Sequence, residues 1–431
     1  MTETGTSYDI AVVGGSSVGG ALACALAQAG LRVAVIEARE PVRAWEAGSV
    51  DLRVFAITRA SERIFRAIGC WADIERGGVS PFRDMRVWDA GGAGSIHFDS
   101  AELGEPTLGY IVEQRVIQAA LNARMETLPT LEYLCPAELG AFETDGDTMR
   151  LTLADGRVLR TRLLVGADGA ASRVRGMAGI AIETRDYDQE AVVGVVATEL
   201  PHQETAWQRF LPTGPLAFLP LRDGRSSIVW STTPQQAAEL CALDPDTFLE
   251  RLTEAFGRRL GRVTAVEERA RFPLRRLHAK QYVAPRLALV GDAAHVIHPL
   301  AGQGVNLGLL DAATLAEVVL AAQAAGRDVG RVTNLRRYER WRHGDNRAMQ
   351  RAMDAFNDLF GTPALPARRL RNAGLGLVDR LGPIKRVLAR HAMGLAGDLP
   401  GMADGRDSAT GIRDSGFSSR DSAIRIRDSG Y

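Results

Sequence analysis

Residues 9–19 read Asp-Ile-Ala-Val-Val-Gly-Gly-Ser-Ser-Val-Gly, a short apolar segment followed by a glycine-rich turn. The apolar part predicts a buried strand over 9–13, and the small residues after the turn predict a helix over 21–29. A second apolar segment, 32–36, predicts the next strand and leads directly to Glu37. This order predicts a Rossmann-like α/β unit that binds a dinucleotide, because the turn presents helix N–H groups to a pyrophosphate.

Individual positions of the turn have distinct expected roles. Gly14 permits the tight turn, and Gly19 permits close packing of the helix on the strand. Ser16 stands where a second glycine normally lets phosphate approach the backbone, so phosphate affinity is expected to be kept or lowered. Glu37 is spaced to accept a hydrogen bond from a ribose hydroxyl. A purely structural glycine turn is the alternative interpretation.

Two further predicted strands end in an acidic residue beside glycine. Residues 163–167 lead to Asp168, and residues 287–290 lead to Gly291 and Asp292. Parallel strands open a ligand crevice at their carboxyl ends. We therefore expect Glu37, Asp168 and Asp292 to face one crevice.

The rest of the chain has a different character. Alternating segments with turn residues predict an antiparallel sheet, interpreted as a substrate domain inserted into the dinucleotide-binding domain. Residues 303–325 and 334–360 are predicted to be helical. The predicted division is 1–75, 105–180 and 276–362 for the dinucleotide-binding domain, 76–104 and 181–275 for the substrate domain, 363–400 for a basic helical segment, and 401–431 for a disordered tail. In the tail Arg-Asp-Ser recurs every seven residues from 406, without the apolar positions of a coiled coil.

Composition excludes several classes of function. Lys+Arg and Asp+Glu both number 52, so no net field favours nucleic acid as a partner. The four cysteines lie too far apart in sequence for a zinc or redox motif. The N-terminus lacks the features of a secretory signal, and no apolar run approaches the roughly 20 residues of a membrane span. We expect a cytoplasmic protein, with peripheral contact at the inner face of the membrane and homo-oligomerisation both left open.

Residues 291–308, Gly-Asp-Ala-Ala-His-Val-Ile-His-Pro-Leu-Ala-Gly-Gln-Gly-Val-Asn-Leu-Gly, form the most specific motif. Asp292 is placed to bind a polyol hydroxyl, and the helix that starts near Gly304 can stabilise a negatively charged ring edge. A reduced isoalloxazine has such an edge, whereas a nicotinamide does not. The motif therefore favours a flavin.

With the motifs at 14–19, 166–175 and 291–306 in this order, the chain resembles the FAD-dependent aromatic hydroxylases of the para-hydroxybenzoate hydroxylase fold. Within that superfamily it is similar to the ubiquinone-biosynthesis hydroxylases, most of all to the 2-polyprenylphenol hydroxylase branch. The resembling stretches include 51–61, 110–116 and 298–308, and the resemblance covers about residues 8–400. It implies an α/β fold: a Rossmann-like FAD-binding domain with an inserted antiparallel-sheet substrate domain and a helical C-terminal region.

The resemblance also implies the residues that contact FAD. Those for the pyrophosphate and the adenosine ribose would be Gly14, Ser16, Ser17, Val18, Gly19 and Glu37. Those for the pyrophosphate and ribityl chain would be Arg53, Gln114, Gly291 and Asp292, while Asp168 belongs to a motif associated with both FAD and NAD(P)H. Those around the ring would be Pro299, Gly302, Gln303, Gly304, Val305 and Asn306. Taken without the resemblance, Arg53 is equally well a surface arginine and Gln114 a helix-cap glutamine.

The implied reaction is a monooxygenation. NAD(P)H would reduce FAD, and O2 would then supply the oxygen that hydroxylates the ring of a polyprenylated phenol, in the manner of a 2-polyprenylphenol 6-hydroxylase. No acid–base or nucleophilic residue is assigned, since the flavin carries the chemistry. The alternatives are a sibling ubiquinone hydroxylase acting on another carbon, a hydroxylase of another aromatic, or a flavin-binding structural subunit of a quinone-biosynthesis assembly.

Three further features have two interpretations each. His295 and His298 have no third ligand beside them, so we predict no metal site and expect both to pack or hydrogen-bond near the flavin loop. The basic segment 363–397 either lies on anionic lipid or packs as an amphipathic helix on its own domain. Residues 207–221 either line an apolar substrate channel or belong to the core of the inserted sheet.

Ser16 gives a direct test of the predicted phosphate site. Ser16→Gly should keep or improve FAD affinity, whereas Ser16→Leu should abolish it, because a large side chain blocks the approach of phosphate to the backbone. Fluorescence titration of the apoprotein with FAD measures both variants. Unchanged affinity in the leucine variant would show that phosphate does not pass this turn.

Overall fold

The computed structural model describes residues 6–92, 94–298, 304–361 and 381–405. Its first sheet is centred on β1 (Thr6–Val13), which pairs in parallel with β2 (Val33–Ile36) and with β11 (Val158–Gly166). The outer strands are β8 (Leu131–Leu134) beside β2, and β18 (Leu287–Leu289) with β17 (Val283–Ala284) beside β11. β9 (Leu139–Asp145) and β10 (Thr148–Leu153) extend β11 as an antiparallel flap. The chain order thus reverses between β1 and β11, where an open α/β sheet binds its ligand.

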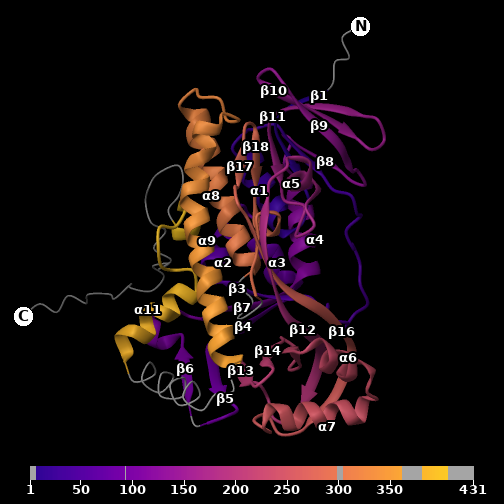
Figure 1. Ribbon diagram of the computed structural model, residues 1–431, viewed down its shortest axis with the longest axis vertical. Coiled ribbons are helices and arrows are strands. Elements are labelled where there is room, and N and C mark those ends of the chain that lie inside the picture. Colours follow the sequence, from indigo (N-terminus) through magenta and orange to yellow (C-terminus); the bar gives the residue numbers. More distant parts are fainter. Residues whose placement is uncertain (1–5, 93, 299–303, 362–380, 406–431) are drawn as a thin grey trace, which may run out of the picture.

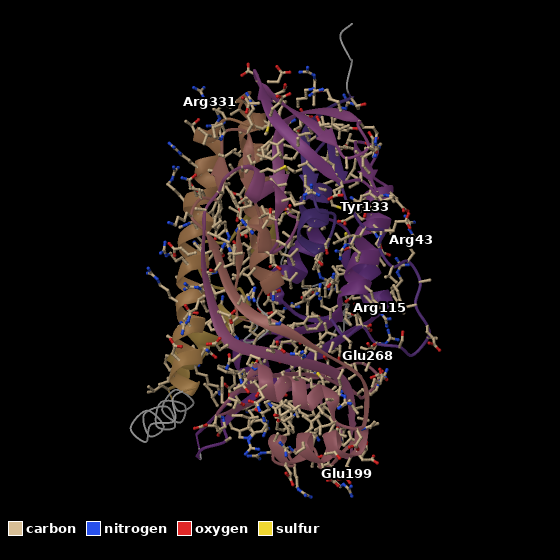
Figure 2. All side chains as sticks on the ribbon, turned by 45° about the vertical axis from the view of Figure 1, so that its right-hand side comes forward. Arg43, Arg115, Tyr133, Glu199, Glu268 and Arg331 are labelled. Atoms are coloured by element: carbon tan, nitrogen blue, oxygen red, sulfur yellow. The ribbon has the colours of Figure 1, made fainter. Side chains whose placement is uncertain are left out.

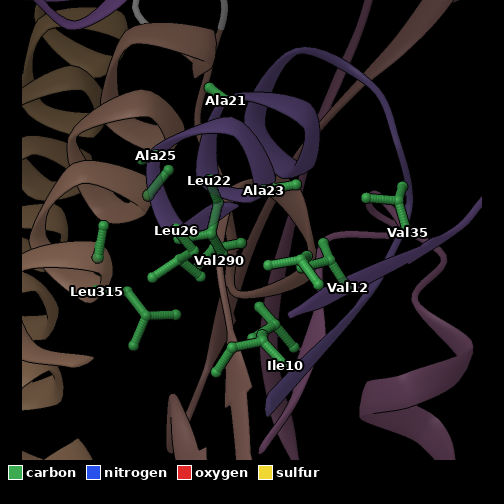
Figure 3. Packing of buried hydrophobic residues seen from close by; sticks show 14 of the residues in the cluster. Ile10, Val12, Ala21, Leu22, Ala23, Ala25, Leu26, Val35, Val290 and Leu315 are labelled. Atoms are coloured by element: carbon green, nitrogen blue, oxygen red, sulfur yellow. The ribbon is translucent and has the colours of Figure 1, made fainter. Parts of the chain in front are cut away.

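Helices cover this sheet. They are α1 (Ser17–Gln28), α4 (Gln114–Glu126), α5 (Arg173–Met177), α8 (Gly304–Ala324) and α9 (Val332–Gly361). The small residues of α1 allow it to lie close to the sheet, and Leu22 and Leu26 pack among Ile10, Val12 and Leu315 (Figure 3). The predicted strands and helices of this domain are confirmed to within a few residues.

α8 corrects the expectation that no apolar run in the sequence approaches the length of a membrane span. By length and composition it could cross a membrane, with a mean hydropathy of 1.6 over its most apolar window. However, 83% of that window is buried inside the protein. α8 is therefore the core helix of the dinucleotide-binding domain, and its apolar composition reflects contact with α1, α2 and α9.

A second sheet has the order β19-β16-β12-β15-β14-β13-β5-β6. Its strands are β5 (Asp84–Asp89), β6 (Ser95–Asp99), β12 (Ile182–Thr198), β13 (Thr205–Leu211), β14 (Gly214–Pro220), β15 (Ser226–Thr232), β16 (Val263–Ala279) and β19 (His295–Val296). The long strands β12 and β16 run from the first domain into the second (Figure 1). The predicted antiparallel pairing holds throughout this sheet except between β13 and β5, which are parallel.

A small sheet joins the two domains. It has the order β3-β7-β4, made of β3 (Val54–Thr58), β7 (Gly109–Glu113) and β4 (Val79–Phe82). α2 (Arg59–Ala67) and α3 (Trp71–Gly78) adjoin it, while the 3-10 turn η1 (Ala101–Leu103) lies beside β6 and α11 (Gly382–Ala392). β4 thus pairs with strands of the first domain, although its residues were assigned to the substrate domain from sequence.

The C-terminal part requires a second correction. α11 (Gly382–Ala392) lies within the predicted helical segment, but α12 (Gly401–Asp404) lies within the predicted tail. α12 packs against α2 and α8, Ala403 is fully buried, and the Gly401 N–H donates to Glu317 Oε2 at 2.9 Å. Residues 401–405, predicted to belong to the tail, therefore pack on the first domain through contacts with distant helices that the sequence does not reveal. Residues 406–431 lie outside the described residues.

Two truncations test this boundary. Removal of 406–431 should leave the melting temperature and FAD binding unchanged, because that segment is too polar to bury a core. Removal of 401–431 should cost about 1–3 kcal/mol, since it also deletes the α12 contacts. Thermal unfolding of both chains makes the comparison, and equal melting temperatures would contradict it.

Candidate functional site

The glycine turn at the end of β1 is packed too tightly for side chains. Gly14 has φ +100°, and a Cβ there would lie 2.4 Å from the carbonyl oxygen of Ala167. A Cβ on Gly19 would lie 1.9 Å from the carbonyl oxygen of Gly14. The turn, α1 and the end of β11 are thus held in direct backbone contact, as the sequence pattern predicted.

The N-terminus of α1 is ready to bind an anion. Ser16 is the N-cap, but its side chain makes no capping hydrogen bond, so the first N–H groups of the helix keep their donor capacity. The Ser17 hydroxyl is buried and has no hydrogen-bond partner among the described residues. Both serines line the main cavity. An unpartnered hydroxyl beside a positive helix end fits a bound phosphate.

Glu37 lies across the turn from α1. Its carboxylate accepts the N–H of Gly15 at 2.7 Å and the N–H of Arg39 at 3.0 Å. These bonds fix the carboxylate at the edge of the cavity, at the end of β2. The fixed carboxylate keeps lone pairs for a ribose hydroxyl, in line with the expected role.

Asp168 has a structural role that the sequence did not reveal. It lines the cavity, but its carboxylate accepts from Ser172 Oγ at 2.5 Å and from the N–H groups of Arg173 and Val174 at 2.7 and 3.1 Å. It therefore holds the start of α5 against the end of β11. Any contact with a dinucleotide would use the remaining lone pairs of a carboxylate that is already oriented.

Asp292 follows β18 in the 3-10 turn η2 (Gly291–Ala293). Its side chain is exposed because it opens into the cavity, although protein atoms surround the cavity wall around it. Burial raises the pKa of the Asp292 carboxyl, while His295 and Arg53 oppose that rise. Gly291 has φ +60°, and a Cβ there would lie 3.2 Å from Val18. The turn thus brings Asp292 close to the start of α1.

Arg53 and Gln114 lie together at the wall of the cavity. Arg53 Nη1 donates to Gln114 Oε1 at 3.3 Å, and the Gln114 N–H donates to the Arg53 carbonyl at 2.9 Å. Both residues line the cavity, which brings a cation and an amide to the end where Ser16 lies. A surface arginine and an unrelated helix cap are therefore the weaker interpretations.

A buried carboxylate on α8, Asp311, holds the 291–295 segment in place. Its Oδ2 accepts the Gly291 N–H at 3.2 Å and the His295 Nε2–H, and its Oδ1 accepts from Arg342 Nε at 2.8 Å. Asn346 donates to it at 3.0 Å. Burial alone would raise the pKa of Asp311, but His295 and Arg342 together lower it to about 2. The sequence signal for this residue was an acid within an otherwise apolar helix.

The two histidines have protein partners. His295 is bound to Asp311, and His298 Nε2 lies 3.2 Å from Gln189 Oε1. Burial lowers the pKa of His298 to about 4, so its imidazole is neutral at pH 7. The described residues contain no cluster of metal ligands. The predicted hydrogen-bonding role of both histidines is confirmed.

Asn306, expected at the ring edge, uses its side chain to join three segments of the protein. Its side chain accepts the Thr58 N–H at 3.0 Å and the Ser61 hydroxyl at 2.7 Å, and it donates to the Ala56 carbonyl at 2.8 Å. These bonds join the start of α8 to β3 and α2. Gly304 and Val305 do line the cavity, whereas Pro299, Gly302 and Gln303 lie outside the described residues.

One cavity of about 1140 Å³ collects most of the predicted residues. Those that line it are Gly14, Ser16, Ser17, Val18, Glu37, Arg53, Gln114, Asp168, Asp292, Gly304 and Val305; Gly19, Gly291 and Asn306 pack behind it. The three acids at the strand ends thus face one crevice, as expected. Its volume exceeds the roughly 300–1,000 Å³ of ordinary small-molecule sites, which leaves room for a dinucleotide and a second ring.

A smaller depression of about 440 Å³ adjoins the cavity at the end of β2. It shares Ser16, Glu37 and Arg53 with the main cavity. Tyr133 and Arg115, which also line it, lie on the same side of the molecule (Figure 2). The crevice therefore widens toward solvent at its nucleotide end.

The other end of the main cavity is apolar. One face of β13, β14 and β15 lines it, together with Phe82, Met85, Phe98 and Leu108. The opposite face, with Leu216, Phe218 and Trp230, packs against α6 (Pro234–Ala242) and α7 (Pro245–Phe256). The 207–221 stretch thus contributes to the core of the inserted sheet with one face and lines the apolar end of the cavity with the other.

The chain is similar to proteins of known activity. A family model described as an FAD binding domain matches residues 7–353. A ubiquinone hydroxylase of Rhodospirillum rubrum is 44% identical over 90% of this chain and 89% of its own length. The 3-demethoxyubiquinol 3-hydroxylase of Escherichia coli is 41% identical over 91% of this chain and 100% of its own length.

Solved structures share the fold. A p-nitrophenol 4-monooxygenase from Pseudomonas putida matches with a TM-score of 0.75 at 22% identity, over 91% of this chain and 99% of its own. PqsL from Pseudomonas aeruginosa, solved in complex with 2-aminobenzoylacetate, matches with a TM-score of 0.72 at 26% identity, over 86% and 99% of the two chains.

Asp292 and Asp311 form a matched pair for mutation. Asp292→Asn should weaken FAD binding by about 1.5–3 kcal/mol, because a charged acceptor is lost, while the apoprotein keeps its stability. Asp311→Asn should destabilise the apoprotein itself by about 3–5 kcal/mol, because Arg342 loses its buried counter-charge. Thermal unfolding with and without FAD separates the two effects, and a stable Asp311→Asn apoprotein would refute the clamping role.

Proposed function

The chain belongs to the FAD-binding-domain family of ubiquinone hydroxylases, and from that premise we propose that it hydroxylates the ring of a polyprenylated phenol with NAD(P)H and O2. The observation that carries the proposal is the single cavity with two unlike ends. A polar end holds Ser17, Glu37 and Asp292, and an apolar end is lined by the second sheet. A cavity with these two ends suits a dinucleotide at one end and a prenylated ring at the other.

Bound FAD would accept a hydride from NAD(P)H and activate O2, and the chain's own residues would bind, orient and shield it. The α1 N-terminus and Ser17 would hold the phosphates, Glu37 the ribose and Asp292 the ribityl hydroxyls. Asp311 would keep Asp292 in place through the Gly291 N–H and His295. The apolar lining would exclude water from the reacting centre, which matters because water there would favour release of the oxygen as hydrogen peroxide over its transfer to the ring.

α11 supports peripheral contact with the inner face of a membrane. Ala389, Ala392 and Met393, toward the end of α11, line the apolar end of the cavity. The outer side of α11 exposes 64% of Val387 beside the exposed Arg386. A helix that borders the substrate chamber on one side and presents apolar and basic groups on the other suits entry of a prenylated substrate from anionic lipid.

The finer part of the proposal is which ring carbon is hydroxylated. The resemblance to the 2-polyprenylphenol branch favours the position oxidised before any methoxy group is present. A second candidate is a later step, favoured by similarity to the Escherichia coli enzyme whose name specifies demethoxyubiquinol.

Intermediate profiling in a deletion strain tests both candidates. Accumulation of the unmodified polyprenylphenol, with rescue of quinone synthesis by this chain, is the expected outcome. Accumulation of a methoxylated intermediate would assign the later step. Normal quinone levels, together with NAD(P)H consumption that no prenylated phenol stimulates, would refute the function itself.

A further inference from the structure

The apolar end of the cavity contains few polar side chains. On the cavity-facing side of β13, β14 and β15 the lining residues are Ala206, Gln208, Pro215, Ala217, Leu219, Val229 and Ser231. Gln208 and Ser231 are thus the polar members of this surface, and it carries no Lys or Arg within the described residues. The arginines that line the cavity, Arg39, Arg53 and Arg173, belong to the segments around its nucleotide end.

Gln208 projects into this chamber from the middle of β13. The residues paired with it are Ala217 on β14 and Val87 on β5, and neither side chain forms hydrogen bonds. Only 8% of Gln208 is exposed, and no described residue hydrogen-bonds its amide. The amide is not among the fully buried atoms that lack a partner, so it opens into the chamber, where its donor and acceptor are available to a molecule bound there.

The chemistry of the amide restricts that ligand. A carboxamide both donates and accepts, which matches the hydroxyl of a phenol. A ring carboxylate would need a cation nearby, because burying an unpaired charge in an apolar chamber is costly. The small Ala217 beside Gln208 leaves room for a ring.

We propose that Gln208 hydrogen-bonds the ring hydroxyl of a neutral phenol that carries no ring carboxylate, and so orients the ring in the chamber. This inference rests on the proposed function and names the substrate class of that same site. Ser231, two residues beyond Val229 on β15, is the competing polar contact.

Binding of two probes to the FAD-loaded enzyme tests the inference. The probes are 2-farnesylphenol and farnesylbenzene, which differ only in the hydroxyl, and perturbation of the flavin absorbance reports their Kd values. The wild-type enzyme should bind the phenol about tenfold more tightly, the value expected for one neutral hydrogen bond. Gln208→Leu should reduce that ratio to near one while FAD content and melting temperature stay unchanged.

Two control variants and a third probe test whether the effect is specific to Gln208 and to neutral phenols. Gln235→Leu removes an exposed amide on α6 and should keep the tenfold ratio. Gln208→Met serves as a second apolar replacement if the leucine variant folds poorly. 3-Farnesyl-4-hydroxybenzoate should bind the wild-type enzyme at least tenfold more weakly than 2-farnesylphenol, because the described residues around the apolar end of the chamber offer its carboxylate no cation.

Failure of the Gln208 assignment, of the neutral-phenol class and of the proposed function each gives a different result. A tenfold ratio that survives in Gln208→Leu and Gln208→Met, or that is lost in Ser231→Ala instead, overturns the assignment of Gln208. Tighter binding of the hydroxybenzoate overturns the neutral-phenol class. If the wild-type enzyme binds no farnesylated probe, the proposed function fails, and the inference fails with it.

Discussion

The arrangement of the site depends on one buried carboxylate. Asp311 has no exposed surface, and its oxygens accept from Gly291, His295, Arg342 and Asn346. These donors come from the turn after β18 and from α9, so one charge ties two elements to α8. An unpaired carboxylate there would be strongly destabilising, which means that the charge and its donors must form together. The position of Asp292 in the cavity follows from that requirement.

Close packing between α1 and α8 completes the arrangement. Val18 lies against both Gly291 and Gly308, where added Cβ atoms would come within 3.2 and 2.7 Å of it. The start of α1 therefore cannot move away from the 291–295 turn without opening a void. Because Ser16 and Ser17 directly precede Val18, the N-terminus of α1 and the turn that carries Asp292 are held at a constant separation.

Much of this could be predicted because it follows from local constraints. The apolar segment 9–13, the glycine turn and the acids at strand ends each reflect a requirement that neighbouring residues impose. The Asp311 contacts could not be predicted, because their partners are distant in sequence. Asp168 and Asn306 were assigned to the cofactor by motif, yet their side chains mainly brace backbone. Gln208 gave no signal, since one polar residue in an alternating strand is ordinary.

Side chains of β13, β14 and β15 point alternately to the two faces of the sheet, and this has an evolutionary consequence. Leu216, Phe218 and Trp230 belong to the packing with α6 and α7, whereas Ala217 and Val229 face only the chamber. Substitutions at Ala217 and Val229 alter the shape of the chamber without disturbing the packing against α6 and α7. New substrate preferences can therefore arise by single steps, with no compensating changes elsewhere, and a common scaffold can diversify while its stability is conserved.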